Sequence, residues 1–220
     1  MIYFNRVAEF KAERTFPMNL PNKLTLLRVF MVPVFMIVMI ADIFPPELEW
    51  LRRTIAAVVF ILTGLTDMLD GKIARKRNLI TNFGKFMDPL ADKVMVFGAM
   101  LSIIYRDADI RPVFVWAAAV VMFRELAVTS VRLVACGHDG SVIAASKLGK
   151  IKTVCQIICI CTVLLEPVLF KAVGLIFPAV LPIAEWHVLA YLTMALMIVM
   201  TVWSGFDYIK TYWSHISPNE

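Results

Sequence analysis

The sequence predicts an all-α polytopic membrane protein with six transmembrane helices. Of its 220 residues, 60% are hydrophobic and 18% are charged, and the apolar residues gather in long segments separated by polar or proline-containing stretches. Soluble domains carry about 45–50% apolar residues, whereas a helix needs roughly 20 of them in a row to cross a bilayer. The length suits one compact helical bundle rather than two domains.

Six segments are long and apolar enough to be the expected spans. They cover approximately residues 23–41, 52–77, 84–105, 112–136, 146–165 and 186–209. The prolines between Glu166 and Glu185 indicate an external stretch after the fifth span. Trp186 and Trp203 lie near the ends of the sixth span, as is typical of residues at the membrane interface.

The segments outside the spans divide the chain further. Residues 1–18 place apolar side chains among charges, which favours a short amphipathic helix on the membrane surface, although a partly ordered tail fits equally well. Residues 19–210 form the expected six-helix domain, and residues 211–220 a cytoplasmic tail.

Positive charge sets the expected orientation in the cell membrane. Few basic residues lie near one face, namely Arg52, Arg53, Arg106, Arg111 and Lys171, and most of the others lie at the opposite ends of the spans. The positive-inside rule therefore places both termini in the cytoplasm. The net charge of +5 fits membrane lipid headgroups or phosphorylated substrates, and the sequence predicts no nucleic-acid partner.

Four aspartates stand at the cytoplasmic ends of the second and third spans. Asp67 and Asp70 are three residues apart and Asp88 and Asp92 are four apart, so each pair shares one face of its helix. Carboxylates at this depth need a positive partner, and four oxygen donors suit Mg²⁺ or Mn²⁺, with room for two ions. Salt bridges to nearby Lys and Arg are the alternative.

Small residues accompany these carboxylates. Gly71, Ala74 and Gly84 would let a bulky ligand or a neighbouring backbone approach closely. Arg75 could pair with a phosphate or with one of the aspartates. A divalent-cation transporter would explain the aspartates, but not these small residues at fixed spacing.

The run from Asp67 to Asp92 reads D-x-x-D-G-x-x-A-R-x8-G-x3-D-x3-D. This pattern resembles the signature of the CDP-alcohol phosphotransferases, which implies a homodimeric six-helix enzyme that transfers a phosphatidyl group to an alcohol and releases CMP. The resemblance implies that Asp67, Asp70 and Asp88 hold two metal ions, and that Asp92 completes the set and acts as general base. It implies a CDP pocket formed by Asp67, Asp70, Gly71, Ala74, Arg75 and Gly84.

Four further stretches are similar to one branch of that family, the bacterial phosphatidylglycerophosphate synthases. They are residues 20–28, 88–94, 123–126 and 147–153. The resemblance implies CDP-diacylglycerol as donor and sn-glycerol 3-phosphate as acceptor. Inositol phosphate, serine and phosphatidylglycerol stay open as alternative acceptors.

The phosphate of such an acceptor needs cations. Candidates near the cytoplasmic ends of the fourth and fifth spans are Arg124, Arg132, Lys147, Lys150 and Lys152. Membrane anchoring is the alternative role for the lysines, and an internal salt bridge for Arg124.

The start of the first span offers possible contacts to the donor or its headgroup, namely Asn22, Thr25 and Arg28. Arg28 could instead extend its charged end to the membrane interface.

Overall fold

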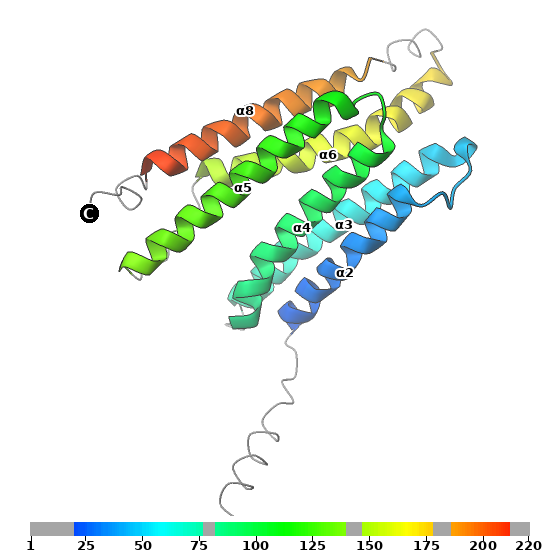
Figure 1. The fold of residues 1–220 in the computed structure, drawn as a ribbon. Helices are drawn as coiled ribbons and strands as arrows, with labels where there is room; N and C mark the ends of the chain where they lie inside the picture. Colours follow the sequence, from blue (N-terminus) through cyan, green and yellow to red (C-terminus); the bar gives the residue numbers. More distant parts are fainter. Residues whose placement is uncertain (1–19, 77–81, 140–146, 178–185, 212–220) are drawn as a thin grey trace, which may run out of the picture.

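The computed structural model describes residues 20–76, 82–139, 147–177 and 186–211, and the regular secondary structure of this part of the chain is entirely helical (Figure 1). The side chains of residues 20–21, 67–76, 82–83, 85–86 and 133–139 lie outside the description. The helices are α2 (Leu20–Ile40), α3 (Glu49–Lys76), α4 (Asn82–Arg106), α5 (Arg111–Asp139), α6 (Lys147–Gly174) and α8 (Val188–Thr211), with a 3₁₀ turn η1 (Pro46–Leu48) before α3. The expected N-terminal surface helix, residues 1–18, lies outside the described residues.

Successive helices run in opposite directions, so the start of α2 and the end of α8 lie at the same end of the bundle (Figure 1). Helix α2 packs against both α3 and α4, while α8 packs against α5 and α6. Contacts of α3 with α6, and of α4 with α5 and α6, join the two groups. The beginning of α4, the end of α5 and the beginning of α6 therefore meet at one end.

Four of the described helices are long and apolar enough to cross a membrane: Asn22–Ile40, Arg111–Arg132, Lys147–Gly174 and Val188–Thr211. The sequence predicted six. Helices α3 and α4 are of similar length but carry more charge within the described residues. Arg52 and Arg53 stand near the start of α3, and Asp88, Asp92 and Lys93 in the first half of α4.

Close contact between α2 and α4 fixes the core near the middle of the bundle. Val32, Phe35 and Met39 form the buried face of α2, and Phe35 meets Phe60 of α3 with ring centroids 5.9 Å apart. A Cβ atom added to Gly98 of α4 would lie 2.7 Å from Cγ1 of Val32. The missing side chain of Gly98 therefore permits the approach, as small residues do at helix interfaces in membranes.

Helix α6 extends to Gly174, beyond the expected end near residue 165. Pro167 does not end it, although proline cannot donate to the carbonyl four residues earlier. That carbonyl, of Val163, accepts a hydrogen bond from Nη1 of Arg53 at 3.4 Å. A side chain of α3 thus satisfies the polar group that the proline leaves open.

Glu166 is also placed differently from the expectation, which put it at the start of an external stretch. Its side chain is buried and accepts hydrogen bonds from the backbone N–H groups of Leu189 at 3.0 Å and Ala190 at 2.8 Å. These are first-turn donors of α8 without partners inside the helix. Glu166 therefore caps α8 and joins it to α6.

Charged residues at the other end of the bundle pair with one another. Glu49 forms an ion pair with Arg52 at 2.8 Å and accepts hydrogen bonds from Arg53 and Arg106, each at 3.1 Å. Arg53 also pairs with Asp107. These arginines, expected near the outer face, are therefore neutralised by acids from several segments. Glu49 joins α3 to the end of α4.

Candidate functional site

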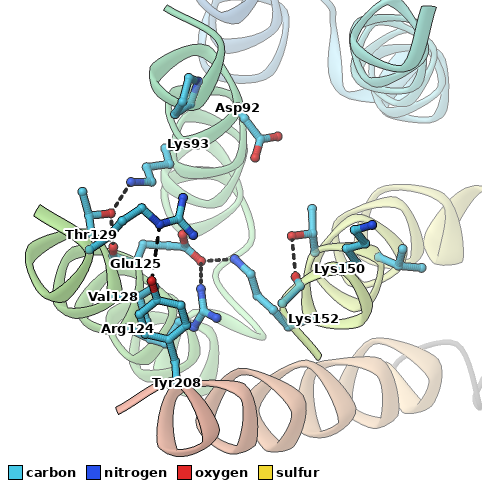
Figure 2. Close-up of a pocket in the computed structure, with 14 residues that line it drawn as sticks. Asp92, Lys93, Arg124, Glu125, Val128, Thr129, Lys150, Lys152 and Tyr208 are labelled. Atoms are coloured by element: carbon cyan, nitrogen blue, oxygen red, sulfur yellow. Dashed lines mark hydrogen bonds and ion pairs between the residues drawn. The ribbon is translucent and has the colours of Figure 1, made fainter. Parts of the chain in front are cut away.

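A cavity of about 370 Å³ opens where α4, α5, α6 and α8 meet (Figure 2). Its charged lining consists of Asp92, Lys93, Arg124, Glu125, Arg132, Lys150 and Lys152. Five of these side chains are basic and two are acidic. The cavity therefore favours an anionic ligand with hydrogen-bond acceptors.

Asp92 extends from α4 into the space between α4 and α6 (Figure 2). The next residue, Lys93, donates a hydrogen bond from Nζ to Oγ1 of Thr129 on α5. The hydroxyl of Thr129 in turn donates to the backbone carbonyl of Glu125 at 2.7 Å. The donor direction of Thr129 is thereby fixed, and its lone pairs are left for Lys93.

Glu125 holds two cations on the cavity wall. Its Oε1 accepts from Nη1 of Arg124 at 3.1 Å and from Nζ of Lys152 on α6. All three side chains are largely buried, with exposed fractions of 11% for Arg124, 12% for Glu125 and 7% for Lys152. An ion pair this buried depends on correct geometry, because desolvation is costly.

Helix α8 completes the wall with Tyr208, and Gly205 of the same helix lies against Arg124. The hydroxyl of Tyr208 accepts a hydrogen bond from Nε of Arg132 at 3.5 Å, and the arginine Cζ lies 5.9 Å from the ring centroid. A Cβ atom at Gly205 would lie 3.2 Å from Cγ of Arg124. The sequence alone did not predict that α8 contributes to the site. Its only indication there is Tyr208, which follows Gly205 by one turn near the polar end of the helix.

Four of the five basic residues expected at the acceptor lie on this cavity with Asp92: Arg124, Arg132, Lys150 and Lys152. Lys147 does not line it, and its side chain is exposed. The salt bridge considered as an alternative for Arg124 is also present, to Glu125. Arg124 therefore both lines the cavity and forms an internal salt bridge. Lys93, Thr129 and Tyr208 line the cavity without having been anticipated.

The polar start of α2 lies against the start of α4. Asn22, Thr25 and Arg28 are buried, and Arg28 is completely so. This burial within the protein excludes extension of Arg28 along the lipid surface. Oγ1 of Thr25 donates to Oδ1 of Asp88 at 2.7 Å, so α2 helps to orient one of the four aspartates.

The remaining expected residues lie at the same end of the bundle (Figure 1). Positions 67, 70, 71, 74 and 75 fall in the last turns of α3, and position 84 in the first turn of α4. The side chains from Asp67 to Arg75 lie outside the described residues. Among the side chains that are described, no three acidic, His or Cys groups form a metal cluster. The metal set therefore stays a prediction.

Comparison with known proteins gives the family. The model of the CDP-alcohol phosphatidyltransferase family matches residues 18–203. The chain belongs to this family. The CDP-alcohol phosphatidyltransferase match begins just before α2 and reaches well into α8. It covers every cavity-lining residue of α4, α5 and α6, and ends before Tyr208 of α8.

Curated members of the family are similar over most of the chain. A protein of Bacillus subtilis named CDP-diacylglycerol–glycerol-3-phosphate 3-phosphatidyltransferase is 41% identical over 207 residues, which cover 91% of this chain and 98% of the relative. A probable phosphatidylglycerophosphate synthase of Mycobacterium tuberculosis H37Rv is 35% identical, over 87% of this chain and 80% of its own. A Rickettsia typhi protein with the same name as the Bacillus one is 32% identical, over 88% and 98%.

Proposed function

We propose that the protein transfers the phosphatidyl group of CDP-diacylglycerol to sn-glycerol 3-phosphate, giving phosphatidylglycerol phosphate and CMP. The observation that carries this proposal is the cavity, which joins Asp92 of the family signature to five basic side chains. Relatives 32–41% identical to the chain carry names that state this reaction. An acceptor without a phosphate, such as serine, would offer these basic side chains fewer anionic oxygens.

The acceptor phosphate is expected between α5 and α6. Arg132 and Lys150 offer charged donors on the cavity wall. Arg124 contributes to the same wall, and its Nε is buried with no hydrogen-bond partner among the described residues. An unsatisfied buried donor costs about 1–3 kcal/mol, so a phosphate oxygen that accepted a hydrogen bond from this donor would recover part of that cost.

The cofactor would be Mg²⁺ or Mn²⁺, with two ions held by Asp67, Asp70, Asp88 and Asp92. The donor chemistry fits, because all four are carboxylates at positions near the meeting ends of α3 and α4. The hydrogen bond from Thr25 to Asp88 resembles the outer contacts that orient metal ligands. Bound ions would offset the negative charge of the diphosphate and of the departing CMP.

Asp92 would accept the proton of the acceptor hydroxyl while the oxygen of that hydroxyl forms a bond to the phosphorus of the phosphatidyl group. The bond from that phosphorus to CMP breaks, and CMP leaves with the electron pair. Asp92 suits this role because it lines the cavity that holds the cations. General-base catalysis of this kind contributes about 10²–10⁴-fold to the rate.

The nucleotide would lie beside the signature residues. Gly71, Ala74 and Gly84 would leave room for CDP, with Asp67, Asp70 and Arg75 beside it. Asn22, Thr25 and Arg28 would support the donor side from α2. The burial of these three polar residues on one face favours an inward role for all of them.

We further propose that α3 and α4 also span the membrane, giving six spans in residues 19–210. Both termini and the cavity would then face the cytoplasm, with residues 211–220 as a tail. The up-and-down order of the helices supports this arrangement. We expect a homodimer, which the molar mass of the purified protein in detergent would test.

The reaction is tested by CMP release from CDP-diacylglycerol, with Mg²⁺ or Mn²⁺ and a panel of acceptors. We expect release with glycerol 3-phosphate and little with inositol phosphate, serine or phosphatidylglycerol. Arg132→Ala should raise KM for glycerol 3-phosphate about tenfold or more and leave KM for CDP-diacylglycerol nearly unchanged. No release with any alcohol, where the Bacillus relative is active, would refute the proposal.

A further inference from the structure

An acidic residue on the wall of a phosphate pocket is unexpected. Glu125 lies among the basic residues of the cavity, where its negative charge opposes the binding of an anionic acceptor. Nothing in the chemistry proposed above uses this carboxylate. Its position therefore calls for another role.

The carboxylate of Glu125 joins two helices at the cavity. Oε1 accepts from Arg124 on the same helix and from Lys152 on α6 (Figure 2). Two cations that share one carboxylate oxygen approach each other more closely than repulsion would otherwise allow. Their side chains are more than 88% buried, so few other positions are open to them.

A second connection runs through the backbone of the same residue. The carbonyl of Glu125 accepts from Thr129, whose hydroxyl accepts from Lys93 on α4. Basic side chains from α4, α5 and α6 are thus all connected to residue 125. The carboxylate and the carbonyl together set where three of the five cations stand.

We propose that Glu125 is a positioning residue for the acceptor site, which fixes Arg124 and Lys152 in the arrangement that receives the phosphate of the acceptor. The proposal rests on the proposed function. Phosphate recognition depends on the direction of the hydrogen-bond donors as well as on total charge. The improved direction of these donors outweighs the repulsion between the Glu125 carboxylate and the phosphate.

Glu125→Gln separates this role from two simpler ones, because the variant keeps the shape of the side chain and removes the charge. If Glu125 only subtracts positive charge, the variant should bind glycerol 3-phosphate more tightly. If it is only structural, the variant should melt at a lower temperature with KM unchanged. If Glu125 is a positioning residue, the variant should bind glycerol 3-phosphate more weakly and show a higher KM for it.

We expect Glu125→Gln to raise KM for glycerol 3-phosphate about tenfold, the size expected when charge-assisted hydrogen bonds are misdirected. KM for CDP-diacylglycerol should change less than twofold. Inorganic phosphate, tested as a competitor, should lose potency in parallel. Glu125→Asp restores the charge on a shorter side chain and should recover part of the affinity.

Glu49→Gln is the matched control. Glu49 also joins several arginines, of which Arg52 is fully buried, but at the opposite end of the bundle. Its variant should melt at a lower temperature and keep the KM of the native protein for both substrates. A rise in KM in this control as large as in Glu125→Gln would overturn the positioning role.

The outcomes separate the two proposals. A native protein that releases no CMP with any acceptor would refute the proposed function. A native protein active with glycerol 3-phosphate, together with an unchanged or lowered KM in Glu125→Gln, would overturn the role of Glu125 alone. If the Gln variant does not fold, Glu125→Asp decides: a KM raised about threefold or more supports the proposal, and an unchanged KM overturns it.

Discussion

Asp92 and Asp88 stand one turn apart on α4, yet they have different surroundings. Asp92 lines the cavity with the basic residues, whereas the carboxylate of Asp88 accepts a hydrogen bond from Thr25 of α2. These surroundings assign them different parts in the proposed reaction. Asp92 would act on the acceptor, and Asp88 would hold metal in an orientation set by α2.

Asp92→Asn should lower kcat at least about 100-fold, because the amide cannot accept the proton of the acceptor hydroxyl. Binding of CDP-diacylglycerol should be largely retained, since three other aspartates remain. CMP release and equilibrium binding of the donor measure the two effects. Asp109→Asn, an exposed position at the other end of the bundle, serves as control. Near-normal turnover by Asp92→Asn would remove it as the base.

Thr25→Val should lower the affinity for the metal ion without removing a metal ligand. The variant keeps the shape of the side chain but loses the donor to Asp88, and loss of such outer contacts typically costs 10–100-fold in metal affinity. The concentration of Mg²⁺ for half-maximal activity should therefore rise about tenfold. Thr54→Val is the control, because the hydroxyl of Thr54 donates to the backbone carbonyl of Trp50 in its own helix. An unchanged Mg²⁺ requirement would contradict the role of Thr25.

At the scale of single residues, the sequence predicted those site residues that follow the spacing of a helix. Arg124 and Arg132 are eight residues apart, so their common face follows from the helical period, and both line the cavity. Thr129 and Tyr208 could not be predicted in this way, because their partners come from other helices. Lys147 is the first residue of α6 and does not reach the cavity wall.

At the scale of elements, the α2–α4 contact positions the two helices that hold Thr25 and Asp88. Gly98→Ala should force them apart, because the new Cβ would lie 2.7 Å from Val32. We expect a loss of about 1–3 kcal/mol in stability, measured as thermal unfolding in detergent, together with lower activity.

Two variants control for this effect. Val32→Ala removes the clashing methyl and should restore part of the stability of Gly98→Ala. Gly64→Ala places its Cβ 3.6 Å from Met95, an ordinary contact, and should be neutral or slightly stabilising. Equal losses in Gly64→Ala and Gly98→Ala would show that the close contact with Val32 is not the cause.

The expected and observed helices differ most at α6. Prolines after Leu165 predicted an external stretch, but the helix continues to Gly174. Its continuation depends on contacts that no local pattern reveals. Arg53 satisfies the carbonyl of Val163, and Glu166 finds its partners at the start of α8.

At the scale of the molecule, charge is distributed differently at the two ends. At one end Arg52, Arg53 and Arg106 pair with acids. The lining of the cavity at the other end has more basic than acidic side chains. The positive-inside rule counts Lys and Arg rather than net charge. The basic residues outside the paired end therefore support a cytoplasmic position for the cavity.

This orientation can be measured with single cysteines introduced at exposed positions of the two ends, after Cys136, Cys155, Cys159 and Cys161 are replaced by serine. Asp109→Cys lies in the turn between α4 and α5, and Lys147→Cys begins α6. A membrane-impermeant maleimide should label position 109 in intact spheroplasts and position 147 only after lysis. The reverse pattern would place the cavity outside, away from any cytoplasmic supply of CDP-linked donor, and would contradict the proposed orientation.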